Sequence, residues 1–591
     1  MKATVVGVGG ASFELLEGAT PYKQDDAESY LRHGWWTGVT LGDLLDRAAG
    51  VHPDKEAFVD RESRLTYAQA RERTDRLALA FLELGIKPLD RVLVQLPNWN
   101  EFVPVYFGLQ KIGAIPVMLI DRYRQQEVER LAEISQATSW IVPVRYGKVD
   151  YTPIILDVLT AMPQLQRVIT VRGEVAEEGF PCLEKLVAQT KPTAAALARL
   201  AELRPDARQV CHMGPTGGTT GMPKVVCRTH DSLGACVGLC SLAWEQHCED
   251  INLIVGSIGH DLNFTKGLLG SLVTMGTIVM VDTTDMQVIC ETIQRERVTS
   301  IVWVPTLAQR LLQYEHLGDY DLSSLKKMHC GGGVALPSLV REVFGRLGAR
   351  LCNGYGATEG MSTITRPIDD IETVCSTVGR PTCPADTYKV VDKKGAPLPP
   401  DTPGELLVKG PSVFTGYYRN DEENARVFEP DGFFHTGDVA KISPRGYVTI
   451  TGRIKEMINR GGESISATQI EDLIDRHPDV AIVAVVAMPD PVMGERVCAY
   501  IQPAKGASVT FEGVIAFLRA EKTSVLALPE RIEFVEAMPY TPAQKVDKNA
   551  LREDIRRRLA SEDQADRTVG TGSGYESAPL QRDRKDPENG R

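Results

Sequence analysis

The stretch from Met213 to Lys224 constrains this chain more than any other part of the sequence, because glycine and threonine dominate it. Glycines let the backbone bend so that successive N–H groups face one concave surface, a geometry that suits phosphate oxygens. Threonine hydroxyls add neutral donors or a metal ligand, and Lys224 adds a mobile positive charge. We therefore predict a phosphate-binding loop made of Thr216, Gly217, Gly218, Thr219, Thr220, Gly221 and Lys224.

Other interpretations of the glycine-rich stretches explain the residues less well. The loop is not a Walker P-loop, because Pro223 stands where that motif has its second glycine and Val225 follows the lysine. An ordinary glycine-rich turn would not need this density of donors. Near the N-terminus, residues 4–10 are also glycine-rich, but Phe13 holds the place of the last glycine of a dinucleotide fingerprint. We expect a leader rich in turns there.

Composition limits the classes of protein that fit. A chain of 591 residues is long enough for several domains, and its formal charge of -12 argues against a nucleic-acid partner. Its 12 cysteines contain no CxxC pair, which indicates reduced thiols and a cytoplasmic location. Cys236 and Cys240 lie at helical spacing in an apolar stretch, which favours buried thiols over metal ligands. We find no apolar run long enough to span a membrane and no signal-peptide core.

Hydrophobic periodicity predicts an α/β fold. Short apolar runs alternate with amphipathic segments of helical period, a pattern typical of stacked parallel α/β layers. Helices are expected to begin at Leu41 and to cover residues 68–84 and 102–112. Strands are expected at residues 57–60, 65–67, 91–98, 115–120, 251–255, 278–281, 301–304 and 327–330.

Four further clusters follow the phosphate loop along the chain. They are Asn353–Gly360, His435–Asp438, Gly452–Glu463 and Pro539–Lys545. Taken singly, each could be a turn or a solvated pair of charges. In this order, they resemble the motifs of the adenylate-forming enzymes, the superfamily of acyl-CoA synthetases, aryl-acid AMP ligases and luciferases.

The resemblance implies an organisation in domains. A large N-terminal domain of stacked α/β sheets with a β-rich portion would cover residues 1–452, and a small, mobile α/β lid would cover residues 453–560. Lys455 would be the hinge on which the lid rotates. Residues 561–591 are rich in glycine, serine and charge, so we predict a disordered tail there.

The resemblance also implies roles for residues at the matching positions. Gly354, Tyr355 and Gly356 would hold adenine, Asp438 and Arg453 the ribose, and Thr358 the α-phosphate, while Glu359 would be the Mg²⁺ ligand. Lys545 would be the adenylation lysine, and with Thr358, Glu359 and His260 it makes up the expected catalytic set. The acid would contact His260, Asp261, Gly332 and Gly333. The thiol arm of the second substrate would pass Arg460, Gly461 and Gly462.

Within the superfamily, the flanking segments look most like 2,3-dihydroxybenzoate–AMP ligases. This likeness rests on residues 30–36, 92–98, 149–151 and 458–463. That subgroup reads an ortho-hydroxylated aryl acid with an Asn directly after a His, whereas this chain has Asp261 after His260 and a following segment one residue shorter. An Asp cannot donate a hydrogen bond unless it is protonated. We therefore expect a different acid, aromatic or polycyclic, with a purely structural role for the pair as the alternative.

The sequence thus predicts an ATP-dependent carboxylic acid ligase that forms an acyl-adenylate and then a thioester, with ATP, Mg²⁺ and CoA as cofactors. CoA is preferred because we find no fused carrier domain. One alternative is an aryl-acid AMP ligase that loads the phosphopantetheine of a carrier protein. Another is a ligase using mainly preformed acyl-AMP, because Gln544 replaces the family's glycine before Lys545. A non-catalytic nucleotide-binding protein and a homodimer are also kept open.

Overall fold

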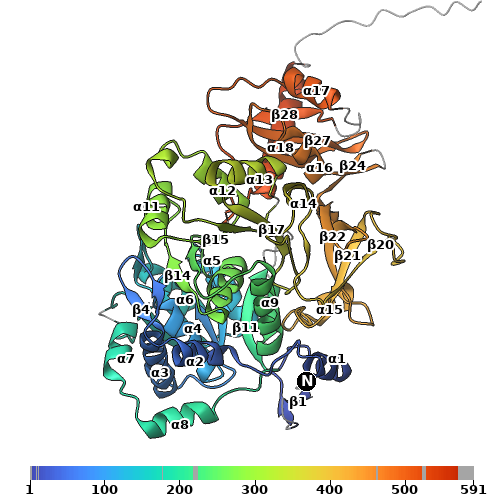
Figure 1. Ribbon diagram of the computed structural model, residues 1–591. Helices are drawn as coiled ribbons and strands as arrows, with labels where there is room; N and C mark the ends of the chain where they lie inside the picture. The colour runs from blue at the N-terminus through green and yellow to red at the C-terminus, as the bar shows by residue number, and fades with distance from the viewer. Residues whose placement is uncertain are drawn as a thin grey trace, which may run out of the picture.

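The computed structural model describes residues 3–7, 10, 12–175, 178–216, 224–333, 335–460, 463–521, 528–542 and 544–569. The chain forms two large mixed sheets with helices packed on them, an antiparallel four-stranded sheet and a separate C-terminal sheet (Figure 1). The expected α/β class is therefore confirmed. The expected helices and strands are present, with ends that differ from the predicted ones by a few residues.

The first large sheet carries the predicted phosphate loop at its edge. Its strand order is β10 (Arg167–Val171), β7 (Ser139–Pro143), β5 (Arg91–Val94), β6 (Ile115–Met118), β11 (Val210–Thr216) and β12 (Lys224–Thr229). Strands β11 and β12 are antiparallel, and their register pairs Thr216 with Lys224. The two ends of the loop therefore meet at the end of a hairpin. Residues 217–223, which include Gly217, Gly218, Thr219, Thr220 and Gly221, lie outside the described residues.

The second large sheet has nine strands and joins segments that are far apart in sequence. Its order is β19 (Arg380–Pro381), β18 (Ser362–Ile364), β17 (Arg350–Gly356), β16 (Lys327–Cys330), β15 (Ser300–Trp303), β13 (Ile251–Ile254), β14 (Thr277–Met280), β3 (Glu56–Val59) and β4 (Arg64–Thr66). Strands β13 to β17 are parallel to their neighbours in the centre of the sheet. In such sheets, ligands bind beyond the carboxyl ends of the strands.

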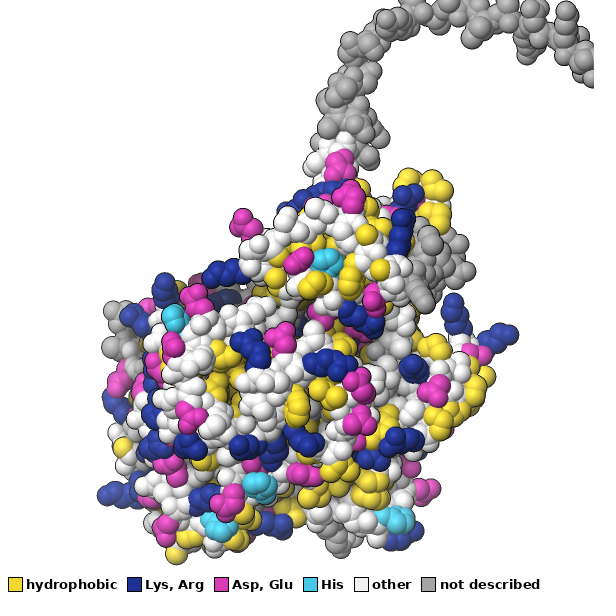
Figure 2. Space-filling model, turned by 45° about the horizontal axis from the view of Figure 1, so that its top comes forward, with side chains coloured by type: hydrophobic (Ala, Val, Ile, Leu, Met, Phe, Trp, Pro, Cys, Tyr) yellow, Lys and Arg dark blue, Asp and Glu magenta, His cyan; other side chains and the backbone are white. Residues whose placement is uncertain are grey.

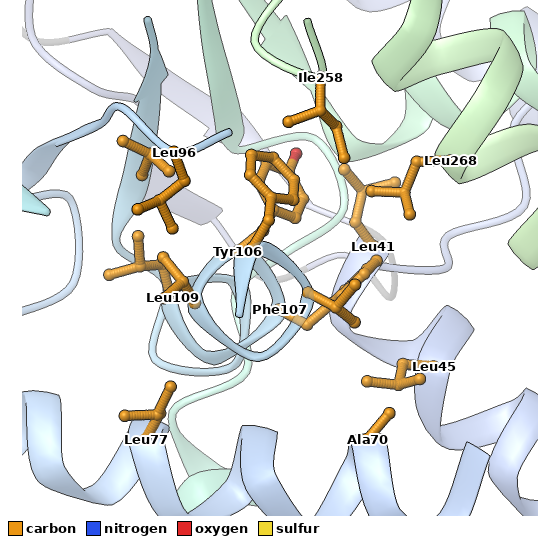
Figure 3. Close-up of a cluster of buried hydrophobic side chains, with 14 of the residues drawn as sticks. Leu41, Leu45, Ala70, Leu77, Leu96, Tyr106, Phe107, Leu109, Ile258 and Leu268 are labelled. Atoms are coloured by element: carbon orange, nitrogen blue, oxygen red, sulfur yellow. The ribbon is translucent and has the colours of Figure 1, made fainter. Parts of the chain in front are cut away.

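Helices fill the space between the two large sheets. Helix α4 (Phe102–Lys111) is buried along its whole length, as its nearly all-apolar sequence predicts. Figure 3 shows Tyr106, Phe107 and Leu109 on this helix facing side chains of α2 (Leu41–Val51), α3 (Tyr67–Glu83) and the segment from Ile258 to Leu268. This shared core fixes the two sheets relative to each other.

Other helices cover the outer faces or connect the strands. They are α1 (Gln24–Arg32), α5 (Gln125–Ser135), α6 (Thr152–Ala161), α7 (Leu183–Gln189), α8 (Ala194–Glu202), α9 (His230–Ala243), η1 (Asn263–Leu269), α10 (Gly270–Val273), α11 (Met286–Glu296), α12 (Pro305–Leu312), η2 (Leu317–Asp319), α13 (Pro337–Glu342), η3 (Val343–Leu347), α14 (Ile371–Ser376) and α15 (Asp421–Val427). Two of them matter for the site: α9, which starts where the Thr229 side chain accepts a hydrogen bond from Ser232 N, and the π-helix η1.

The C-terminal part of the chain packs on α12 and α13 (Figure 1). The antiparallel sheet β20 (Thr387–Val391), β21 (Gly404–Lys409), β22 (Phe434–Ile442) and β23 (Val448–Arg453) leads through η4 (Ile454–Glu456) into it. The C-terminal sheet contains β24 (Met457–Arg460), β25 (Glu463–Ser466), β26 (Val480–Asp490), β27 (Gly494–Pro503) and β28 (Arg531–Phe534), with helices α16 (Ala467–Ile474), α17 (Phe511–Ala520) and α18 (Lys548–Val569). Lysine, arginine and acidic side chains are interspersed on the face drawn in Figure 2.

Two expectations about the termini need correction. The N-terminal patch is an antiparallel pair of β1 (Thr4–Val6) and β2 (Ser12–Glu14), in which each of the three residues of β1 pairs with one residue of β2. The tail expected to be disordered from residue 561 begins as helix, since α18 continues to Val569. A second short hairpin joins β8 (Arg145–Tyr146) and β9 (Val149–Asp150). None of the helices in the described ranges is long and apolar enough to cross a membrane.

Candidate functional site

Asp438 joins the antiparallel sheet to the second large sheet. Its Oδ2 accepts a hydrogen bond of 2.5 Å from the Tyr355 hydroxyl at the end of β17, and its Oδ1 lies 2.9 Å from Arg453 Nε. The register of β22 and β23 places Asp438 directly opposite Arg453. Burial raises the pKa of Asp438, although Arg453 acts to lower it. Asp438 therefore contacts two other residues expected at the nucleotide, Tyr355 and Arg453.

Glu359 and Lys224, the lysine of the phosphate loop, both contact the side chain of Tyr417. The Tyr417 hydroxyl donates to Glu359 Oε1 at 2.7 Å, and Lys224 Nζ lies 4.7 Å from the centre of the same ring. Lys224 also forms an ion pair with Glu423. Burial raises the pKa of Glu359, so its carboxylate would gain from a nearby cation. An oxygen ligand of this kind fits Mg²⁺, which takes one or two carboxylates and completes its shell with phosphates and water.

Thr358 packs against the strand that leads into the phosphate loop. A Cβ on Gly214 of β11 would lie 2.8 Å from Thr358 Cγ2, so only glycine allows this close approach. The buried Arg228 donates to Thr358 O at 3.2 Å and to Ser412 O at 2.7 Å. These contacts hold the Thr358–Glu359 turn against β11 and β12 of the first sheet.

Lys545 reaches from the C-terminal domain into the large domain. Its Cε lies 3.4 Å from the position that a Cβ would take on Gly332, whose φ of 76° is itself left-handed. Burial, helped by Arg453, lowers the pKa of Lys545 to about 8. The pKa of His260 is lowered to about 3, first by burial and then by Lys545. The structure thus brings Lys545, His260 and Gly332 together.

The residue before Lys545 has a strained backbone. Gln544 has φ of 62°, a left-handed conformation that glycine adopts without cost. The Thr306 hydroxyl of α12 donates to Gln544 O at 2.6 Å and helps to hold this conformation. Gln544 thus keeps the positive φ that a glycine before Lys545 would adopt easily.

A cleft lies beside His260 and the loop that carries Lys545. Its walls include His260, Asn263, Trp303, Leu307, Pro542 and Gln544. Pro542 and Gln544 belong to the loop that carries Lys545, so the cleft lies between the two parts of the chain. It supplies open space directly beside the imidazole of His260.

Asp261 follows His260 in the chain and is half-buried. Burial raises its pKa, while Arg228 and Lys266 act to lower it. A raised pKa moves the carboxyl toward the protonated form, which can donate a hydrogen bond. Gly333, the other residue expected at the acid, packs beside Pro305, whose Cδ lies 3.5 Å from the position of an added Cβ.

Some expected residues can be placed only in part. The backbone of Lys455 lies in η4, between the last strand of the antiparallel sheet and the first strand of the C-terminal sheet. The backbone of Arg460 ends β24. The side chains of these two residues, together with Gly461 and Gly462, lie outside the described residues.

Two buried polar residues near the site were not singled out from the sequence. Lys266 on η1 is 8% exposed and His329 on β16 is 3% exposed. The signal for Lys266 was a single cation between Phe264 and Leu268 in an apolar segment, and for His329 a histidine within a buried strand. Both signals are weak, because burial and partners are unknown from sequence.

Two family models and several known proteins match this chain over most of its length. The family model described as AMP-binding enzyme matches residues 45–418, and the model of the AMP-binding enzyme C-terminal domain matches residues 469–545. The chain is 36% identical to a salicylyl-CoA synthase / salicylate adenylyltransferase from Streptomyces sp, over 91% of this chain and 98% of the relative. It is also 36% identical to the 2,3-dihydroxybenzoate-AMP ligase of Bacillus subtilis, over 92% and 99%.

A solved structure agrees with these relatives. The apo structure of Mycobacterium smegmatis MbtA superposes with a TM-score of 0.68 and 31% identity, covering 91% of this chain and 99% of that one. The resemblance inferred from the motifs is therefore confirmed over residues 45–418 and 469–545, which the two family models match. The chain belongs to the AMP-binding enzyme family, the adenylate-forming ligases.

Proposed function

We propose that this protein is an ATP-dependent aryl-acid ligase that makes an acyl-adenylate and then transfers the acyl group to the thiol of CoA. The observation that carries the proposal is Lys545, a half-buried lysine supplied by the C-terminal domain, which lies against Gly332 and beside His260. Two relatives are named for salicylate and 2,3-dihydroxybenzoate, which supports an aromatic acid as the substrate of this protein.

In the first half-reaction, a carboxylate oxygen of the acid attacks the α-phosphorus of ATP and pyrophosphate leaves. Two anions must approach each other, so positive charge and fixed donors at the phosphates lower the barrier. Lys545 and the donors of the loop ending at Lys224 would provide them, and Thr358 lies against Gly214 of β11, the strand that leads into that loop. Asp438 would accept the ribose hydroxyls. Mg²⁺ held by Glu359 would neutralise phosphate charge.

In the second half-reaction, the thiol attacks the carbonyl carbon of the acyl-adenylate and AMP leaves. We propose that residues 453–560 act as a lid that rotates about Lys455 between the two steps, while residues 1–452 keep the substrates in place. Rotation would withdraw Lys545 and bring Arg460, Gly461 and Gly462 toward the pantetheine arm. Because Pro542 and Gln544 line the cleft beside His260, the same motion would change its shape.

Pyrophosphate exchange with a panel of aryl acids tests the ligase assignment. We expect exchange that depends on the acid and that is lost in Lys545→Ala. If no acid supports exchange, the ligase assignment is wrong and the protein only binds nucleotide. The mass of the product with CoA, compared with a holo-carrier protein, then distinguishes CoA from a carrier as acceptor. The relative named salicylyl-CoA synthase is the reason for putting CoA first.

A second candidate is a ligase that uses mainly preformed acyl-AMP. The positive φ of Gln544 favours it, because strain next to Lys545 would weaken only the step that needs this lysine. Slow pyrophosphate exchange beside fast thioester formation from supplied acyl-AMP is the result that this candidate requires.

A further inference from the structure

The lysine at the end of the phosphate loop is held by a carboxylate of helix α15. Lys224 Nζ forms an ion pair with Glu423, and the two side chains are 23% and 14% exposed. Arg426 donates to both oxygens of the same carboxylate, at 2.8 and 2.6 Å. Arg426 and then Lys224 lower the pKa of Glu423 to about 2. A carboxylate with two cationic donors is therefore fixed, in its charged form, beside Lys224.

Hydrogen bonds to the backbone fix the segment that carries Glu423. The Glu423 N–H donates to Asn420 Oδ1 at 3.2 Å, which caps the start of α15. Asn424 accepts from Tyr417 N at 2.7 Å and donates to Tyr417 O at 2.9 Å. Tyr417 in turn pairs as an isolated antiparallel bridge with Val226 of β12, the strand that begins at Lys224. The segment from Tyr417 to Arg426 is thus tied to the strand whose lysine it holds.

The same segment also contacts the expected Mg²⁺ ligand. The Tyr417 hydroxyl donates to Glu359 Oε1, and the Lys224 ammonium lies over the Tyr417 ring. In nucleotide sites, metal ions bridge the β- and γ-phosphates. A Mg²⁺ held by Glu359 would therefore place the pyrophosphate part of ATP, rather than the adenosine, near Lys224.

We propose that Glu423 is a positioning residue for ATP, which holds the Lys224 ammonium over the Tyr417 ring so that it faces the pyrophosphate part of the nucleotide. This inference rests on the proposed ligase function and adds a residue to its ATP site. An ammonium group has three donors, so Lys224 can bind Glu423 and still donate to a phosphate oxygen. Because Glu423 already orders this side chain, ATP binding does not have to restrict a freely rotating lysine.

The charges around Glu423 explain why its carboxylate does not repel ATP. Lys224, Glu423 and Arg426 together leave one net positive charge. Arg426 is 63% exposed, so water and salt screen its charge. Loss of the Glu423 charge would therefore free Lys224 without adding a strong positive field at the phosphates. The expected effect is weaker binding of ATP.

Calorimetry with Mg-ATP and with AMP tests the proposal, because AMP lacks the pyrophosphate part. Glu423→Gln removes the charge and keeps the shape. It should raise the Kd of ATP by roughly 3- to 30-fold, the cost of ordering one lysine side chain, and leave the Kd of AMP unchanged. Glu423→Asp keeps the charge on a shorter side chain and should lose less. Glu422→Gln is the matched control, since it removes an exposed carboxylate from the same turn of α15 and should change neither constant.

A double-mutant cycle shows whether Glu423 acts through Lys224. Lys224→Met should weaken ATP binding in the wild type and by a smaller factor in the Glu423→Gln background. Equal factors in the two backgrounds would overturn the inference. So would a Kd of ATP that is unchanged or lower in Glu423→Gln, or an equal loss of ATP and AMP binding, which a general change of structure would produce. If Glu423→Gln does not fold, an unchanged Kd of ATP in Glu423→Asp overturns it.

Binding and catalysis separate this inference from the function on which it rests. Suppose that ATP binding responds to Glu423→Gln as expected, while the wild type exchanges pyrophosphate with no acid. The proposed ligase function would then be overturned and the role of Glu423 supported. Exchange with an aryl acid in both the wild type and Glu423→Gln, at an equal KM for ATP, would support the ligase and overturn the role of Glu423.

Discussion

At the scale of single residues, the site is dominated by charged groups whose burial changes their chemistry. Asp438 accepts from both Tyr355 and Arg453 while it is 4% exposed, so a ribose must enter a network that already exists. Burial raises the pKa of Asp438 but lowers the pKa of Lys545, to about 8, because in both residues it disfavours the charged form. We make one prediction for Asp438 and one for Lys545.

Asp438→Ala should weaken ATP binding. The change removes a charged acceptor from the ribose hydroxyls and leaves Tyr355 and Arg453 without their partner. A charged hydrogen bond contributes about 1.5 to 3 kcal/mol, so we expect roughly a 10- to 150-fold rise in Kd by calorimetry. Asp438→Asn, which keeps one acceptor oxygen, should lose less. Unchanged ATP affinity in Asp438→Ala would contradict the ribose assignment.

Adenylation should decline as pH rises through about 8, because the pKa of Lys545 is lowered to that value by burial and by Arg453. The protonated ammonium is the form that offsets phosphate charge, and it is present below this pKa and lost above it. The pH profile of kcat/KM for pyrophosphate exchange reports on the free enzyme. Lys545→Arg should move the falling limb to higher pH, since a guanidinium stays charged. A limb that stays in place would assign it to another group.

At the scale of elements, the loop from Thr541 to Val546 is the structural unit that presents Lys545. Thr541 N donates to Lys545 O at 2.7 Å, and Tyr540 pairs with Val546 as an isolated antiparallel bridge. Gln544 takes the left-handed conformation at the tip of this loop, and Thr306 on α12 holds its carbonyl. The loop is therefore tight, strained at one residue and tied to the large domain.

Gln544→Gly should speed the adenylation half-reaction. A non-glycine residue at this φ costs about 1 to 2 kcal/mol, and the glycine variant removes that cost when the loop docks. We expect pyrophosphate exchange to rise by up to roughly 30-fold, the rate equivalent of about 2 kcal/mol. Thioester formation from supplied acyl-AMP should not change, because that step uses the other orientation of the lid.

Thr306→Val is the matched control for this loop. It keeps the size of the side chain and removes the hydrogen bond to Gln544 O, so it should slow exchange and spare the thioester step. A robust wild-type exchange rate that Gln544→Gly leaves unchanged would show that the strain has no kinetic consequence.

At the scale of the whole molecule, several side-chain hydrogen bonds and an exposed ion pair of Lys505 with Glu315 join the two parts of the chain within the described ranges. Apart from Thr306, Gln309 of α12 donates to Ala481 O, and Ser338 of α13 donates to Asp475. These contacts place the C-terminal sheet above α12 and α13 (Figure 1). Interfaces of this kind permit rotation, and η4 is the short connection on which it would turn.

Lys455→Pro should trap the orientation described here. Proline fixes φ near −65°, which fits a 3₁₀ turn such as η4 and opposes the backbone change that a rotation needs. Pyrophosphate exchange should persist, and thioester formation from supplied acyl-AMP should be lost. Lys455→Ala removes the side chain without fixing φ and should retain both steps. Equal slowing of the two half-reactions in the proline variant would exclude a pivot at this residue.

The sequence alone determined the family and most of the elements, because these depend on contiguous residues. Periodicity predicts α4 and the central strands, and the motifs around Lys224, Tyr355, Asp438 and Lys545 can be recognised without coordinates. Each is a short segment whose chemistry and backbone shape are encoded locally.

Only the tertiary structure decided which distant residues meet. Strand β3 pairs with β14, and Cys236, Lys266 and His329 converge from α9, η1 and β16. Burial, partners and unsatisfied groups depend on such convergence, so the weak sequence signals of Lys266 and His329 gained meaning only there. The same holds for Gln544 and α18. The first adopts a conformation that its side chain disfavours, because contacts from α12 hold it. The second continues to Val569 despite a composition that is typical of a disordered tail.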